Sequence, residues 1–104
     1  MLTKTIALPK LNNLSPTMES TALKLMEETG ELAQAIGKFR GMSGEQTKYQ
    51  EQEVMELISK ELLDVAQTAV SMMFVLEEEY GVNIEKTRER HLEKLISKGY
   101  LHID

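Results

Sequence analysis

The sequence predicts an all-α fold, a helical bundle of three main helices per chain that is completed by oligomerisation. From Met18 to Phe39, apolar residues recur at alternating spacings of four and three, the pattern of a helix with one buried seam. A second stretch, about 45–80, is apolar nearly all round between Leu62 and Leu76, and a 104-residue monomer buries such a surface poorly. Two prolines, six glycines and no low-complexity run favour a compact helical protein over a disordered one.

Residues 1–14 show no clean periodicity but contain five leucine or isoleucine residues, so we expect an N-terminal arm that packs on the rest of the protein. One helical domain is expected over 15–104. Ser15 and Pro16 predict the start of the first helix, with Ser as the N-cap and Pro at the first helical position. This helix is expected over about 16–40, ended by Gly41-Met42-Ser43-Gly44. Its predicted seam consists of Met18, Ala22, Leu25, Thr29, Leu32, Ile36 and Phe39.

The second helix is expected over about 45–80, with its end at Gly81. Its apolar stretch is too short and too closely flanked by charges to cross a membrane, which takes ~20 apolar residues. We therefore expect no membrane partner. Because a single chain of this size buries such a helix poorly, we expect oligomerisation through it. The third helix is expected over about 84–98, and Gly99 ends it.

The net charge of -5 disfavours a nucleic-acid partner, which requires a basic face. Acidity does not exclude a phosphorylated ligand, because bound metal ions reverse the local sign of charge. The absence of cysteine excludes a disulfide, a thiolate nucleophile and a zinc-finger site. No basic segment followed by an apolar stretch is visible at the start, so a cytoplasmic location is the expectation.

Two acidic clusters lie in apolar, helix-like surroundings. Glu27, Glu28 and Glu31 belong to the first helix, and Glu61 and Asp64 belong to the second. Carboxylates placed there are unfavourable unless a cation neutralises them. The sequence offers no buried Arg or Lys obviously assigned to that role, so a divalent metal is the natural candidate.

Helical angles select four of these five carboxylates. Measured from the seam of the first helix at about 100° per residue, Glu28 lies about 80° and Glu31 about 140° to one side, whereas Glu27 lies about 180° away. On the second helix, Glu61 falls within ~20° of the centre of the apolar stripe and Asp64 lies about 80° from it. Glu28, Glu31, Glu61 and Asp64 can therefore converge where the helices pack. Hard oxygen ligands in that number suit Mg²⁺ or Mn²⁺, with room for more than one ion.

Seven further acidic residues are predicted to lie on solvated faces, where Glu is usually found. They are Glu51, Glu53, Glu77, Glu78, Glu79, Glu85 and Glu89. The two histidines, His91 and His102, are predicted to have no special role. Neither belongs to a Glu-x-x-His pair, which disfavours a di-iron carboxylate bundle because such sites need that pair on two helices.

The stretches Glu27-Glu28-Thr29-Gly30-Glu31 and Glu61-Leu62-Leu63-Asp64 resemble the signature of the MazG-like, all-α nucleoside triphosphate pyrophosphohydrolases, Glu-Glu-x-x-Glu followed by Glu-x-x-Asp. The resemblance covers roughly residues 18–98. It implies a helical bundle assembled as a dimer or tetramer. It also implies hydrolysis of a nucleoside triphosphate to the monophosphate and pyrophosphate. The catalytic, magnesium-binding residues implied are Glu28, Glu31, Glu61 and Asp64, with Glu27 as either a base or a surface residue.

The third helix matches the same family less well. Family members often carry Lys-x-x-Lys-Asn there, where this sequence reads His91-Leu92-Glu93-Lys94-Leu95. Lys94 matches, whereas His91 and Leu95 depart from the pattern. Lys94 and Lys98, one turn apart, are candidates for binding the substrate phosphates. The alternative is that both are solvated cations near a helix C-terminus.

The sequence thus predicts a Mg²⁺-dependent pyrophosphohydrolase that cleaves (d)NTP to (d)NMP and pyrophosphate. Two alternatives stay open. One is a non-enzymatic helical assembly or regulatory module, which the long apolar helix and the imperfect third-helix motif favour. The other is a phosphoribosyl-ATP pyrophosphohydrolase-like activity, which the acidic motifs alone do not distinguish.

Overall fold

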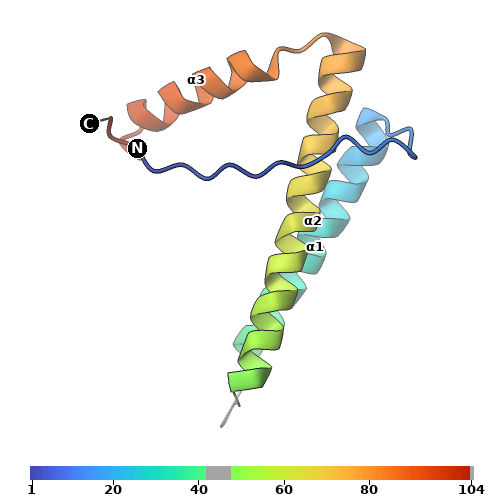
Figure 1. Cartoon of the computed structure of the whole chain (residues 1–104), viewed down its shortest axis with the longest axis vertical. Helices are drawn as coiled ribbons and strands as arrows, with labels where there is room; N and C mark the ends of the chain where they lie inside the picture. Colours follow the sequence, from blue (N-terminus) through green and yellow to red (C-terminus); the bar gives the residue numbers. More distant parts are fainter. Residues whose placement is uncertain (42–47, 104) are drawn as a thin grey trace.

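The computed structural model describes residues 1–41 and 48–103, and within these ranges the protein has three helices and no strand. These are α1 (Met18–Gly41), α2 (Lys48–Tyr80) and α3 (Ile84–Ser97). α1 and α2 lie side by side along their length, whereas α3 leaves the end of α2 and runs away from this pair (Figure 1). The all-α class with three main helices is confirmed. The predicted turn at 42–44 and the first residues of the predicted second helix, 45–47, lie outside the described residues.

The start of α1 is capped by Thr17. The Ser20 backbone N–H donates to Thr17 Oγ1 at 3.0 Å, and the Thr17 N–H donates to Ser20 Oγ at 2.9 Å. These reciprocal bonds form a capping box in which Ser replaces the usual Glu or Gln. The prediction of Ser15 as the N-cap was wrong, because the hydroxyl pair two residues later is the one that satisfies the free amides of the first turn.

The ends of α2 and α3 agree with the glycine signals. Gly81 has φ +65° and Gly99 has φ +77°, a left-handed conformation that glycine adopts without a steric penalty. After α3, the Tyr100 N–H donates to the Leu95 carbonyl at 2.9 Å, as in a Schellman motif. The side chain of Asn83 caps the start of α3. The predicted helix stops at Gly81 and Gly99 are therefore confirmed.

The contact face of α1 is rotated relative to the predicted seam. Thr21, Glu28 and Ala35 are the buried residues of α1. The predicted seam residues on the opposite edge are exposed: Ala22, Thr29 and Ile36. The remaining members of the predicted seam are half-buried: Met18, Leu25, Leu32 and Phe39. Small side chains at 21 and 35 let α1 approach α2 along this row, so four of the seven predicted seam residues are partly covered and the placement of the other three was wrong.

Large apolar side chains remain exposed on both long helices. Among the described residues, no large side chain is completely buried. The exposed apolar residues of α1 and α2 include Leu23, Met26, Ile36, Met55, Leu62, Leu63 and Met73. A single chain therefore leaves a second apolar face uncovered, which is uncommon for a monomeric soluble protein. In the described part of the chain, no helix is long and apolar enough to span a bilayer.

The N-terminal arm, residues 1–14, is extended and crosses α2 on its way to the start of α1 (Figure 1). Gln67 Nε2 on α2 donates to the Pro9 carbonyl at 2.8 Å. Lys10 forms an ion pair with Glu78, nearer the end of α2. The last part of the arm is thus attached to α2, whereas Ile6 near its start is exposed.

Candidate metal centre

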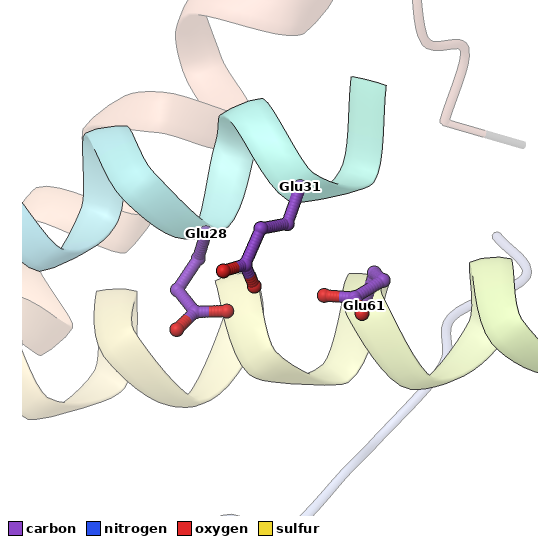
Figure 2. Close-up of side chains that lie close together, drawn as sticks. All are labelled: Glu28, Glu31 and Glu61. Carbon is purple, nitrogen blue, oxygen red and sulfur yellow. The ribbon is translucent and has the colours of Figure 1, made fainter. Parts of the chain in front are cut away.

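Three of the predicted carboxylates lie together between α1 and α2. One oxygen from each of Glu28, Glu31 and Glu61 lies within 4.8 Å of the other two. Figure 2 shows Glu28 and Glu31 reaching from α1 and Glu61 reaching from α2 into the same space. We call these three residues the carboxylate cluster. Two consecutive helices therefore contribute to one acidic site.

The cluster occupies the middle of the helix contact because its members belong to heptad rows. On α1, the buried row repeats every seven residues and consists of Thr21, Glu28 and Ala35. On α2, the matching row consists of Val54, Glu61, Thr68 and Val75, of which all but Glu61 are buried. Residues seven apart share one side of a helix. Each row therefore carries one acid among small or β-branched residues, and the two acids meet when the rows pack.

Burial makes two of the carboxylate oxygens conspicuous. The Glu28 side chain is only 8% exposed. Oε2 of Glu28 and Oε2 of Glu61 are both buried, and neither has a hydrogen-bond partner among the described residues. An unpaired buried polar atom costs about 1–3 kcal/mol, and more when it is charged. Two such atoms beside a third carboxylate are what a cation-binding site would present in its metal-free form.

Lys24 partly neutralises the cluster from its edge. Its Nζ lies 3.0 Å from Glu28 Oε1 and 3.8 Å from Glu27 Oε1. These carboxylates raise the pKa of Lys24, chiefly through the hydrogen bond to Glu28. Lys24 is itself 55% exposed, so this ion pair at the edge of the site is distinct from the buried Lys or Arg that the sequence was expected to lack. The i, i+4 spacing of Lys24 and Glu28 is the sequence signal that would have revealed the pair.

The electrostatics of Glu31 reflect its like-charged neighbours. The charge of Glu28 is the largest cause of a raised pKa at Glu31, followed by partial desolvation and then by the charge of Glu61. Adjacent carboxylates disfavour each other's ionised form, and a bound cation would relieve this repulsion. Glu31 is the exposed member of the cluster, so its carboxylate is open to solvent and to a ligand.

Asp64 and Glu27 lie outside the cluster. Asp64 is half-buried on α2, three residues after Glu61, and is not part of the group whose oxygens lie within 4.8 Å. Asp64 lies to one side because Glu61 belongs to the heptad row at the centre of the contact between α1 and α2, and Asp64 does not. Glu27 is exposed and contacts only the edge of the site, through Lys24.

The two candidate phosphate-binding lysines are far from the cluster in this chain. Lys94 lies in the last turn of α3 and Lys98 is its C-cap residue, and both are exposed. α3 points away from the α1–α2 pair that holds the cluster (Figure 1). The structure therefore does not bring Lys94 and Lys98 to Glu28 or Glu61 within one chain.

A cavity beside the cluster was not anticipated from the sequence. Its volume is about 430 Å³, and Glu28, Lys24 and Asp64 lie along it. The N-terminal arm contributes Leu11 and Leu14 to the same cavity. We call this space the arm cavity. The sequence feature that could have indicated this cavity is the set of polar residues within the apolar part of α2, which includes Gln67, Thr68 and Ser71.

Comparison with known proteins identifies one family. The family model of the MazG nucleotide pyrophosphohydrolase domain matches residues 16–99. No curated protein and no solved structure matches the chain. The matched range includes α1, α2 and α3 with the whole carboxylate cluster, whereas the N-terminal arm lies outside it.

Proposed function

The chain belongs to the MazG nucleotide pyrophosphohydrolase family, and from this premise we propose that it is a Mg²⁺-dependent enzyme that cleaves a ribo- or deoxyribonucleoside triphosphate. The products would be the monophosphate and pyrophosphate. The observation that carries this proposal is the carboxylate cluster, with its two buried and unpartnered oxygens. A purely structural contact between two helices gains nothing from acids at that position.

The donor set suits a hard divalent cation. Glu28, Glu31 and Glu61 offer carboxylate oxygens from two helices, and Mg²⁺ or Mn²⁺ prefers such ligands. We propose Asp64 as the fourth carboxylate of the centre, because it is half-buried and lies at i, i+3 from Glu61. Bound there, the cation would neutralise phosphate charge and lower the pKa of a water molecule.

The role that we propose for each carboxylate depends on whether it is buried or exposed. Glu28 and Glu61 would hold the cation from opposite helices, so the site would exist only when α1 and α2 are packed. The proton released by the attacking water needs an acceptor that is not itself a metal ligand, and Glu27 is the nearby exposed carboxylate outside the proposed ligand set. Attack forms a bond from the water oxygen to the α-phosphorus and breaks the bond to the bridging oxygen, so that pyrophosphate leaves.

We also propose that the chain associates with itself, as a dimer or tetramer. The uncovered apolar face includes Leu62 and Leu63 on α2, and Leu23 and Met26 on α1. Burying these side chains against a second copy would stabilise the assembly by about 25 cal/mol per Å² of apolar surface. Within one chain α3 stands apart from the cluster, so its lysines would reach a substrate phosphate only in another copy's site.

The test is pyrophosphate release from a panel of NTPs and dNTPs, with phosphoribosyl-ATP included. We expect release with Mg²⁺ and none with EDTA. Glu28→Gln and Asp64→Asn should lower the rate by about 100-fold or more, because ligand loss exceeds the 10–100-fold effect of outer-shell changes. Glu56→Gln, an exposed acid on the same helix as Asp64, is the matched control.

The panel also separates the alternatives. Cleavage of phosphoribosyl-ATP alone would assign the related activity instead. No release from any substrate at high enzyme concentration would refute the proposed reaction and favour a non-enzymatic helical assembly.

A further inference from the structure

One side of the arm cavity is lined by residues that lie outside the domain matched by the family model. Leu11 and Leu14 of the N-terminal arm lie outside residues 16–99, yet both line the cavity that reaches Glu28 and Asp64. Its volume of about 430 Å³ is within the range of small-molecule sites. A segment outside the family's domain therefore borders the place where the substrate would bind.

The arm is held over this cavity at two points. Before the leucines, the Pro9 carbonyl accepts a 2.8 Å hydrogen bond from Gln67 Nε2, and Lys10 pairs with Glu78. After them, the chain enters α1 through the Thr17 cap. Gln67 itself lines the cavity, so the same side chain positions the arm and faces the space beneath it. The placement of Leu11 and Leu14 is thus built into the fold.

The cavity extends along α2. Its lining on α2 runs from Asp64 through Gln67 to Ser71, two helical turns or about 10 Å. Asp64 lies at the end next to the carboxylate cluster. With its phosphates at the cluster, a nucleotide would extend its sugar and base along α2 beneath the two leucines. Hydroxyl and amide groups on one side and aliphatic groups on the other match the polar edge and apolar faces of a base.

We propose that Leu11 and Leu14 form the specificity-determining wall of a nucleoside subsite in the arm cavity, an inference that rests on the proposed function. None of the described residues that line the cavity is aromatic, so base selection depends on aliphatic contact and hydrogen bonds instead of ring stacking. Leu14 is 65% exposed in the free protein, and a bound base would cover it. The arm therefore determines which nucleosides fit, while the helices perform the chemistry.

The experiment compares the full chain with a Leu11→Ala/Leu14→Ala double variant. For the preferred nucleotide, KM should rise about 10-fold or more while kcat changes little, because lost contacts in an apolar pocket act on binding. The spread of kcat/KM across the NTP and dNTP panel should narrow. Titration calorimetry with the matching nucleoside monophosphate should show the same weakening without turnover. Leu2→Ala, at a fully exposed arm residue outside the cavity, is the matched control.

The outcomes separate the two proposals. If the wild-type chain cleaves nucleotides but the double variant keeps its KM, its monophosphate affinity and its substrate ranking, the arm wall is overturned and the reaction stands. Equal losses in the double variant and in Leu2→Ala also overturn it. A wild-type chain that cleaves no nucleotide overturns the reaction and the subsite together.

Discussion

Replacing Glu61 by Gln should stabilise the metal-free protein and weaken its response to Mg²⁺. Glu61 and Glu28 present buried oxygens with no hydrogen-bond partner, from opposite helices of one contact. Gln keeps the size of the side chain but removes one charge. Its amide also offers a donor to the unpartnered Glu28 Oε2. The variant should therefore bind Mg²⁺ more weakly and be more stable without metal, as expected where a functional site lowers the stability of the protein.

The size of the effect follows from the geometry. The ligand oxygens of Glu28 and Glu61 lie no more than 4.8 Å apart, and two unit charges at that limit repel by about 3.5 kcal/mol at an effective dielectric constant of about 20. The Lys24 ammonium offsets part of this repulsion, and the new hydrogen bond adds about 1 kcal/mol. We expect a net gain of about 1–3 kcal/mol in the free energy of unfolding. For a domain of this size that is a rise of roughly 5–20 °C in Tm.

The metal response should change in the opposite direction. At a Mg²⁺ concentration 100 times Kd, the wild-type protein gains about 2.7 kcal/mol. A 10-fold loss of affinity in Glu61→Gln would reduce that gain to about 1.4 kcal/mol at the same concentration. Urea unfolding with EDTA and with Mg²⁺, at one fixed protein concentration, measures both quantities. Glu56→Gln serves as the control at an exposed acid of α2.

One result would refute the reasoning. If Glu61→Gln lowers the stability of the metal-free protein and retains the full wild-type response to Mg²⁺, then Glu28 and Glu61 do not share a cation.

Two further predictions concern pH and assembly. Neighbouring charges hold the pKa of Glu31 above its ordinary value, so its protonated form stabilises the metal-free protein at low pH and this stabilisation is lost as pH rises through the folded pKa. Melting curves in EDTA from about pH 4 to 8 should show this loss of stability. Adding Mg²⁺ should make the loss smaller, and so should Glu31→Gln. Identical pH profiles for the wild type and the variant would contradict the prediction. Leu62→Glu/Leu63→Glu should lower self-association in sedimentation experiments, because charge would enter the uncovered apolar face. Thr3→Glu, at an exposed polar position of the N-terminal arm away from this face, is its control, and a monomeric wild type would refute the proposed assembly.

Local chemistry made the helices predictable. Heptad spacing and the glycines at 81 and 99 act within a few residues of themselves, so the three helices and two of their ends could be inferred without tertiary contacts. The acidic motifs are equally local, which is why Glu28, Glu31 and Glu61 were candidates from spacing alone. The start of α1 was misplaced because two adjacent hydroxyl-bearing segments compete for one cap, and only the bonds of Thr17 and Ser20 decide between them.

Tertiary structure decided how these local elements face one another. Spacing determines the angles between residues of one helix, but the direction of the contact depends on which side chains let two backbones approach. The small residues Thr21 and Ala35 turned α1 so that Glu28 lies at the centre of the contact and Asp64 falls to its flank. The arm cavity arises from long-range contacts of Pro9 and Lys10 with α2, and no periodicity in residues 1–14 encodes such contacts.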